Sequence, residues 1–366
     1  MTPRTAIVGA GPGGLTCARI LQRQGFPVTV LDRDPAPDAR PQGGTLDMHA
    51  DSGQLALQAA GLLEAFLDLS RPEGQEMRLY DHTGGLLHQH APPPGESFNP
   101  EIDRGQLRAL LLDSLTPGTV QWGRNLTTLT PLGDGVHRAH FEDGSTADYD
   151  LVIGADGAWS RVRRLLSDAV PVYTGVTFVE ISLNNPGTEI SELVGEGTMM
   201  APYDNKALIA QRNSGNRVLV YAALRVPQDW NRGPVSMRDE LLERFADWSP
   251  RLLSLIAKHD GDFVNRPLFA LPVPHKWDHT PGVTLLGDAA HLMSPFSGMG
   301  ANLAMLDAAD LANSIITEPT IDAAVQAYET VMIPRGAEAA HGADEGLNTA
   351  ISPSTDQALA HLTKHL

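Results

Sequence analysis

Glycines and acidic side chains stand at the ends of three short apolar runs in this sequence. The first run, residues 5–8, leads into Gly9, Gly11 and Gly14. Glycines at this spacing permit a tight turn, let the backbone approach a pyrophosphate, and let the next helix pack on the strand. The free N–H groups at the start of that helix can then hold phosphate charge. The pattern predicts a dinucleotide-binding turn.

An acidic residue follows this turn at the sequence separation typical of a nucleotide site. Residues 27–31 form a second strand-like run that ends at Asp32. An acid about 20 residues beyond the glycines suits a hydrogen bond to a ribose hydroxyl. The order strand, glycines, helix, strand and acid favours a nucleotide site over a purely structural glycine turn. It does not distinguish NAD from FAD.

Another of the three apolar runs, residues 149–153, precedes Asp156, Gly157, Ser160 and Arg163. Taken alone, this stretch is equally well explained as a strand-to-helix turn with Ser160 near an N-cap.

The third run, residues 283–286, ends at Asp288 and leads into a glycine-rich turn before an alanine-rich helix. The polar and turn-forming residues of that stretch include Pro295, Gly298, Gly300 and Asn302. The sequence therefore contains three strand-to-turn-to-helix units.

Together the three motifs resemble the class A flavoprotein aromatic hydroxylases, which are single-component FAD monooxygenases. The stretches 40–49, 99–108 and 287–293 look like the flavin-dependent tetracycline-inactivating monooxygenases and their relatives. The resemblance implies FAD as cofactor and NADPH or NADH as reductant. It also implies addition of O2 at flavin C4a and transfer of the distal hydroperoxide oxygen to a polycyclic or phenolic small molecule.

The resemblance also assigns site residues. Cofactor contacts fall on Gly9, Gly11, Gly14, Asp32, Arg33, Asp47, Arg104, Asp156, Asp288, Gly298, Gly300 and Asn302. Arg40 falls beside the cofactor, where the family places a residue for NADPH. No catalytic acid or base is expected, because the flavin performs the chemistry and the turn around Pro295 supports it. We expect Arg108 to be a solvated helix cation and His291 to be structural.

These motifs predict an α/β protein with a Rossmann-like FAD-binding domain of the GR2 type. We expect that domain to comprise residues 1–73, 100–172 and 266–318. Short alternating runs from 172 to 226 indicate a β-sheet substrate-binding domain, comprising residues 74–99 and 173–265. Residues 319–366 form a C-terminal helix region that bridges the two domains.

Substrate contacts are expected at Glu180, Thr198 and Leu219. Tetracycline-inactivating members hold the drug's polar ring there with a glutamine, an arginine and a histidine. This chain has other residue types at these three positions, and each charge-assisted hydrogen bond to the drug that is lost in this way costs about 1.5–3 kcal/mol. A carboxylate at Glu180 would in addition repel the anionic face of the drug. We therefore expect tetracycline to be a poor substrate and a related polyketide or fused-ring phenol to be the natural one. Tetracycline inactivation remains an alternative.

Composition excludes several other classes. The formal charge of −17 argues against nucleic-acid or anionic-membrane partners, and the single Cys17 excludes an internal disulfide. Without HExxH, GxSxG or an apolar run of about 18 residues, we expect a cytoplasmic monomer without a metal. A halogenase lacks support because the tryptophans are scattered. A non-catalytic FAD-binding redox sensor stays open.

Overall fold

The computed structural model describes residues 3–93, 96, 98–231, 236–259 and 261–365. All four apolar runs predicted as strands lie in one parallel sheet with the order β17-β11-β1-β2-β7. Its strands are β1 (Thr5–Val8), β2 (Val28–Leu31), β7 (Val120–Gln121), β11 (Leu151–Gly154) and β17 (Val283–Leu285). Its central strands, β1 and β11, are fully buried, as expected for parallel strands covered on both faces. The predicted α/β fold is confirmed.

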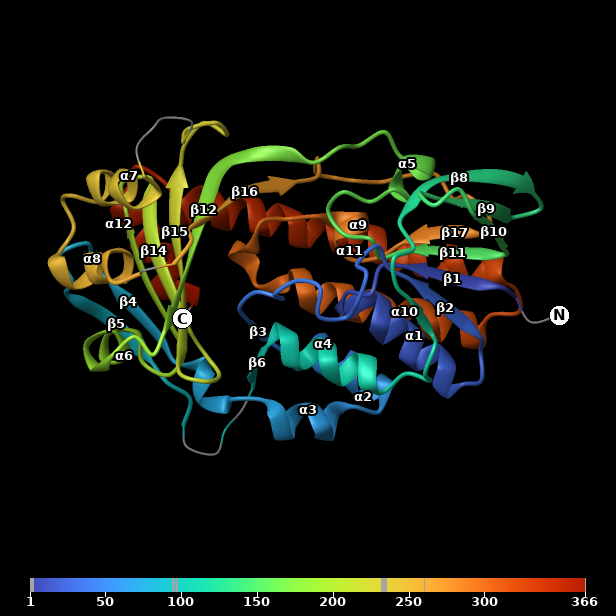
Figure 1. Cartoon of the computed structure of the whole chain (residues 1–366), viewed down its shortest axis with the longest axis horizontal. Coiled ribbons are helices and arrows are strands. Elements are labelled where there is room, and N and C mark those ends of the chain that lie inside the picture. The colour runs from blue at the N-terminus through green and yellow to red at the C-terminus, as the bar shows by residue number, and fades with distance from the viewer. Residues whose placement is uncertain (1–2, 94–95, 97, 232–235, 260, 366) are drawn as a thin grey trace.

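Helices cover the parallel sheet (Figure 1). The first of them packs closely on its neighbours because it is rich in small residues. A Cβ at Gly13 would lie 2.7 Å from the Ala304 carbonyl oxygen, and one at Gly14 would lie 2.1 Å from that of Gly9. The helices of this region are α1 (Pro12–Arg23), α2 (Gly53–Ala60), α3 (Leu63–Leu69), α4 (Arg104–Asp113), α5 (Arg163–Leu166), α9 (Asp288–His291) and α10 (Met299–Thr317). Glycine therefore brings α1 against α10.

Two smaller sheets complete this half of the molecule. The antiparallel strands β8 (Leu126–Gly133), β9 (Val136–Phe141) and β10 (Thr146–Tyr149) contribute side chains to its core. The strands β3 (Thr45–Asp47) and β6 (Glu101–Asp103) pair with each other and lie between the two halves in Figure 1. The short helix η1 (Pro72–Gln75) lies between them in the sequence, directly before the first strand of the second half.

A mixed sheet dominates the second half, with the order β16-β12-β15-β14-β13-β4-β5. Its strands are β4 (Met77–Tyr80), β5 (Leu86–His90), β12 (Val172–Asn184), β13 (Thr198–Tyr203), β14 (Lys206–Asn213), β15 (Arg217–Arg225) and β16 (Val264–Ala270). One face packs on α6 (Thr188–Val194), α7 (Met237–Arg244) and α8 (Pro250–Ala257). The other face turns toward Phe296 and the C-terminal helices.

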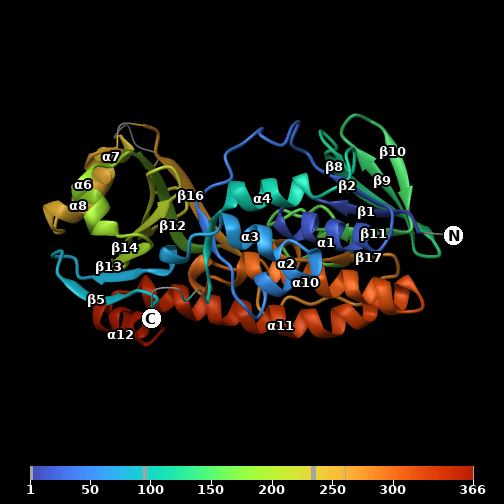
Figure 2. The same ribbon diagram turned by 90° about the horizontal axis from the view of Figure 1, so that it is seen from below.

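One long helix connects the halves. In Figure 2, α11 (Ile321–Ala350) runs along the molecule beneath both sheets, and α12 (Thr355–His365) follows it under the mixed sheet. Tyr328 joins the core of the parallel-sheet half, whereas Leu347 joins that of the mixed-sheet half. The helix continues through Pro334. No helix in the described ranges is long and apolar enough to cross a membrane.

Candidate functional site

The glycine turn leaves open space at the start of α1. Gly11 is the N-cap of this helix, and no heavy atom lies within 4 Å of the position that a Cβ would take there. Gly9 has a φ of +111°, which residues with a side chain rarely adopt, and a Cβ there would lie 2.2 Å from the Ala155 carbonyl oxygen. The N-terminus of α1 therefore presents free N–H groups to a space that suits a phosphate.

Asp32 lies beside this turn at the end of β2. Its Oδ2 accepts a hydrogen bond from Ala10 N (2.6 Å), and its Oδ1 accepts one from Asp34 N (2.8 Å). The carboxylate thus stabilises the glycine turn in addition to its predicted place beside a ribose. Arg33 is exposed next to it, and Arg40 pairs with Asp34 at the rim (2.8 Å).

The expectation that Arg108 is a solvated helix cation is wrong. Its side chain is buried, and Nε donates to the Ala10 carbonyl (3.1 Å) while Nη1 donates to that of Pro37. Arg108 therefore holds the glycine turn from the side of α4. Spacing could not reveal this, because arginines four residues apart are also typical of an exposed helix face.

The stretch after β11 is a capped turn. Asp156 accepts hydrogen bonds from Ser160 Oγ (2.5 Å), Arg161 N (2.6 Å) and Val162 N (3.3 Å), and burial raises the pKa of its carboxyl. The oxygens of Asp156 thus have partners within their own turn, as in the N-cap explanation of this motif. Asp156 therefore supports its own turn, and its contact with the cofactor stays a prediction.

Arg163 connects this turn to the third motif. Its guanidinium donates to the carbonyls of Ala158 (2.6 Å) and Ala289 (3.0 Å). Asp288 begins α9 and is open to solvent, yet the surrounding protein raises the pKa of its carboxyl. The positive charges of His291, Arg104 and Arg163 act in the opposite direction on that pKa.

The turn before α10 faces Asp47. Gly298 has a φ of +67°, and a Cβ there would lie 3.5 Å from Asp47 Oδ2. The same oxygen of Asp47, Oδ2, is paired with His49 Nε2 (2.8 Å). Asn302 is fully buried, and its side chain donates to the Asp47 carbonyl (2.8 Å) and accepts from His49 N (2.9 Å). Asn302 thus holds the Asp47 loop on α10.

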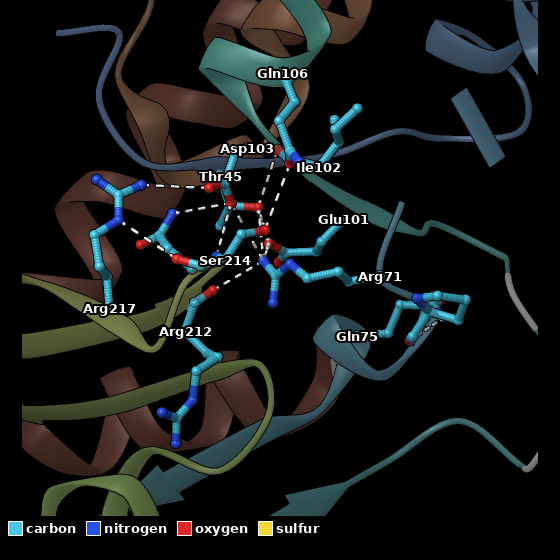
Figure 3. Close-up of polar contacts among 12 residues, drawn as sticks. Thr45, Arg71, Gln75, Glu101, Ile102, Asp103, Gln106, Arg212, Ser214 and Arg217 are labelled. Carbon is cyan, nitrogen blue, oxygen red and sulfur yellow. Dashed lines mark hydrogen bonds and ion pairs between the residues drawn. The ribbon is translucent and has the colours of Figure 1, made fainter. Parts of the chain in front are cut away.

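A buried polar cluster lies where β3, β6 and η1 meet the turn between β14 and β15 (Figure 3). Thr45 Oγ1 donates to Glu101 Oε2 and lies 3.1 Å from the Ile102 carbonyl. Arg71 lies 3.9 Å from Glu101 and 3.8 Å from Asp103, and it donates to the Arg212 carbonyl (2.9 Å). This cluster joins the two halves directly before Arg104, the first residue of α4.

We expect the stability of the protein to depend on Glu101. Burial raises the pKa of this carboxyl from 4.5 to about 7, with Asp47 and Asp103 acting in the same direction and Thr45 and Arg71 opposing them. Because the pKa of Glu101 is higher in the folded than in the unfolded chain, the neutral carboxyl stabilises the fold at a pH below the pKa of the unfolded chain. This contribution is lost as the pH rises through the pKa of the folded protein. The free energy of unfolding should therefore fall by up to about 3 kcal/mol between about pH 4.5 and above about pH 7.

Glu101→Gln should abolish that loss, because the amide stays neutral. Denaturant unfolding across this pH range measures the effect, and Glu73→Gln, which changes an exposed acid of η1, should keep the wild-type slope. Equal slopes for wild type and Glu101→Gln would contradict the assignment.

The three predicted substrate residues share one face of the mixed sheet. Side chains alternate along strands, and the register aligns Leu219 with Gln211 and Gln211 with Thr198, while Glu180 aligns with Tyr221. This is the face that carries Phe178 and turns toward Phe296. We call Glu180, Thr198, Leu219, Gln211, Tyr221 and Phe178 the sheet face.

The expectation of an unpaired carboxylate at Glu180 is wrong. Arg266 on β16 lies on the same face, and its Nε is 2.5 Å from Glu180 Oε2. Because the pair carries no net charge, Glu180 alone does not repel an anionic substrate. The two residues are 86 positions apart, so only the pairing of β12 with β16 reveals the contact.

The sheet face meets the loop that leads to Asp47. A Cβ at Gly44 would lie 3.0 Å from both Leu219 Cδ2 and Tyr221 Oη, and 3.3 Å from Gln211 Oε1. Burial raises the pKa of Tyr221, so its hydroxyl stays protonated at neutral pH. The sequence alone did not indicate Tyr221, Gln211 or Arg266, since only strand register places them on this face of the sheet.

These residues fit a long dinucleotide. The Asp32 carboxylate lies at the glycine turn with the free helix N–H groups, and Arg104 lies beside Gly43, next to the residue that contacts the sheet face. Within the described residues, no group of three or more His, Cys, Asp or Glu side chains could hold a metal ion. The model of the family described as FAD binding domain matches residues 2–339. The chain belongs to this FAD-binding family.

Relatives in the FAD-binding family include monooxygenases. The chain is 33% identical over 372 residues to monooxygenase asqM of Emericella nidulans, covering 85% of this chain and 83% of that protein. HpxO of Klebsiella pneumoniae, solved with FAD and uric acid, has a TM-score of 0.85 at 22% identity, covering 99% and 92% of the two chains. Tetracycline destructase Tet(55) has a TM-score of 0.78 at 22% identity, covering 99% and 94%.

Proposed function

We propose that this chain is an FAD-dependent monooxygenase that uses NAD(P)H and O2 to hydroxylate a planar fused-ring or heteroaromatic molecule. The single observation that carries the proposal is the contact of the sheet face with the Gly44 loop. It puts a face rich in aromatic, amide and hydroxyl groups next to the loop of Asp47. A substrate on that face would lie beside a cofactor bound along the Asp47 loop.

The chain's own residues would bind the cofactor and the substrate, orient them, and exclude water from the site. When bound, FAD reduced by NAD(P)H would activate O2 and supply one oxygen atom to the substrate. The α1 N-terminus and Arg104 would hold its phosphate-bearing part, with Asp32 near a ribose. The Gly298 turn would let the backbone approach the planar ring, and Phe178 and Phe296 would shield the substrate from water.

The reductant would approach beside Arg40. A cavity of about 690 Å³ lies between the loop 37–42 and α4, and Arg40, Arg108 and Trp122 line it. On a protein with a formal charge of −17, exposed arginine is the group that would attract a phosphate-bearing reductant. This supports the placement of Arg40 near NAD(P)H.

Substrate-stimulated oxidation of NADPH tests this function. We expect a panel of fused-ring phenols and hydroxylated heteroaromatics to contain compounds that accelerate NADPH oxidation by the FAD-loaded protein. A redox sensor without catalytic function would show one slow rate whatever the compound. Loss of acceleration in Tyr221→Phe or Gln211→Ala, with FAD still bound, would place the responsible compound on the sheet face.

Tetracycline should be a slow substrate. The relevant positions carry Glu180, Thr198 and Leu219 in place of the drug-binding glutamine, arginine and histidine of tetracycline-inactivating enzymes. Arg266 neutralises Glu180, so the expectation depends on the lost direct bonds, each equivalent to about 10–150-fold in affinity. Loss of drug absorbance with NADPH and O2 measures it. Rapid loss at micromolar drug, with a product heavier by one oxygen atom, would favour the alternative of a tetracycline-inactivating monooxygenase.

A further inference from the structure

An ion pair borders the aromatic side chains of the sheet face. Arg266 Nε lies 2.5 Å from one carboxylate oxygen of Glu180, and Arg266 Nη2 lies 3.3 Å from the other. Glu180 stands opposite Tyr221 in the strand register. Arg266 stands opposite Phe178, and the ring of Phe178 is 5.3 Å from that of Tyr221. A planar ligand against these two rings would therefore lie beside both charges.

The two partners of this pair differ in their access to solvent. The Glu180 side chain is 16% exposed, whereas that of Arg266 is 53% exposed. Both charges act on the Tyr221 hydroxyl, whose pKa is raised by Glu180 and lowered by Arg266. The carboxylate of the pair is thus largely enclosed by protein, and its guanidinium lies on the edge strand β16, where a ligand can reach it.

The other arginines on this side of the mixed sheet also have partners. In the described strands of this sheet, the strand register places two more Lys or Arg side chains on the side of Arg266, namely Arg217 and Arg225. Arg217 Nη2 donates to Asp103 Oδ2 (3.3 Å), and Arg225 Nε donates to the Ile351 carbonyl (3.0 Å). The strands therefore offer a ligand no cation that is without a partner.

A substrate that carries a carboxylate would compete with Glu180 for Arg266. If it displaced Glu180, that largely enclosed carboxylate would lose its partner, and a bond to the more exposed guanidinium returns little. If it bound the remaining N–H groups of Arg266, two carboxylates would share one guanidinium and repel each other. An uncharged ring meets neither cost, and the Tyr221 hydroxyl and the Gln211 amide offer it hydrogen bonds.

We infer that the Glu180–Arg266 pair is a specificity determinant: by holding Arg266, Glu180 makes the site select an uncharged hydroxylated aromatic ring over an aromatic carboxylate. The inference rests on the proposed function, which places the substrate on the sheet face and gives the cation Arg104 to FAD. It adds the charge of the substrate to the planar shape named there.

The experiment compares 2-naphthol with 3-hydroxy-2-naphthoate, which share the fused rings and differ in one carboxylate. Titration calorimetry of the FAD-loaded protein at pH 7 measures both dissociation constants. Wild type should bind 2-naphthol at least about tenfold more tightly. Glu180→Gln frees Arg266 and should shift the ratio of the two constants at least about tenfold toward the carboxylate. Arg266→Gln should shift the ratio in the opposite direction, because Glu180 then faces the ligand without its partner.

Two further variants isolate the effect of the pair. The double variant Glu180→Gln with Arg266→Gln removes both charges, so its ratio should return to that of wild type. Glu189→Gln breaks an ion pair with Lys258 (2.5 Å) between α6 and the end of α8, on the opposite face of the mixed sheet. It makes the same change in net charge as Glu180→Gln and should keep the wild-type ratio.

The outcomes separate this inference from the proposed function. Unchanged ratios in both single variants, tighter binding of the carboxylate by wild type, or no binding of either compound would overturn the inference. Ratios that shift as stated, without NADPH oxidation stimulated by any compound of the fused-ring panel, would instead refute the monooxygenase function and leave the selection by charge. Partial misfolding cannot imitate the expected result, because it lowers both affinities and the two single variants shift the ratio in opposite directions.

Discussion

We expect Gly11→Val to fold normally and to purify without FAD. Gly11 has φ −83° and ψ 176°, an extended conformation that valine adopts readily. No heavy atom lies within 4 Å of the added Cβ, so the protein itself offers no clash. The side chain would instead fill the space at the start of α1 that we assign to pyrophosphate. FAD affinity should fall by at least about 100-fold, or about 2.7 kcal/mol.

The ratio of flavin to protein absorbance after gel filtration measures this loss, and the melting temperature of the apoprotein shows that the fold is intact. Gly14→Val provides the contrast, because its Cβ would lie 2.1 Å from the Gly9 carbonyl oxygen. That variant should lose stability as well as FAD. Full FAD occupancy in Gly11→Val would mean that the glycine turn is not the pyrophosphate site.

Gly298→Val should keep FAD but lose at least about 100-fold in turnover. The φ of +67° at this position is strained for any β-branched residue, at a cost of about 1–3 kcal/mol. The new side chain would also lie against Asp47, whose Oδ2 is 3.5 Å from the added Cβ. Because the α1 N-terminus is left unchanged, the effect should appear in substrate-dependent NADPH oxidation while the flavin absorbance persists.

Gly342→Ala is the matched control. Gly342 is an exposed glycine within α11 with no heavy atom within 4 Å of an added Cβ. Alanine should raise helix stability by up to about 1 kcal/mol and leave turnover unchanged. Wild-type turnover in Gly298→Val would show that the turn is only a connection between α9 and α10.

Local sequence signals were sufficient for the parallel sheet and its turns. The strand at residues 5–8 and the glycines after it obey rules that act within a few residues, and the structure places them as predicted. The acid Asp32 also stands beside the turn as expected, with its carboxylate 2.6 Å from Ala10 N. Glycine turns are predictable because steric limits on the backbone are local.

Contacts between distant segments were not predictable in the same way. Arg108 contacts the glycine turn only because α4 packs beside it, and Arg266 neutralises Glu180 only because β16 pairs with β12. Neither arrangement leaves a periodic signal in one sequence. The partners of Asp156 and Asn302 within the chain likewise become visible only in three dimensions.

The most direct test of the central claim is the fate of oxygen-labelled O2. The FAD-loaded protein is incubated with NADPH, labelled O2 and the compound that most strongly accelerates NADPH oxidation, and the product is analysed by mass spectrometry. The account predicts a product that carries one labelled oxygen atom for each NADPH consumed in coupled turnover. A product whose added oxygen comes from water, or hydrogen peroxide formed without any oxygenated product, would contradict it.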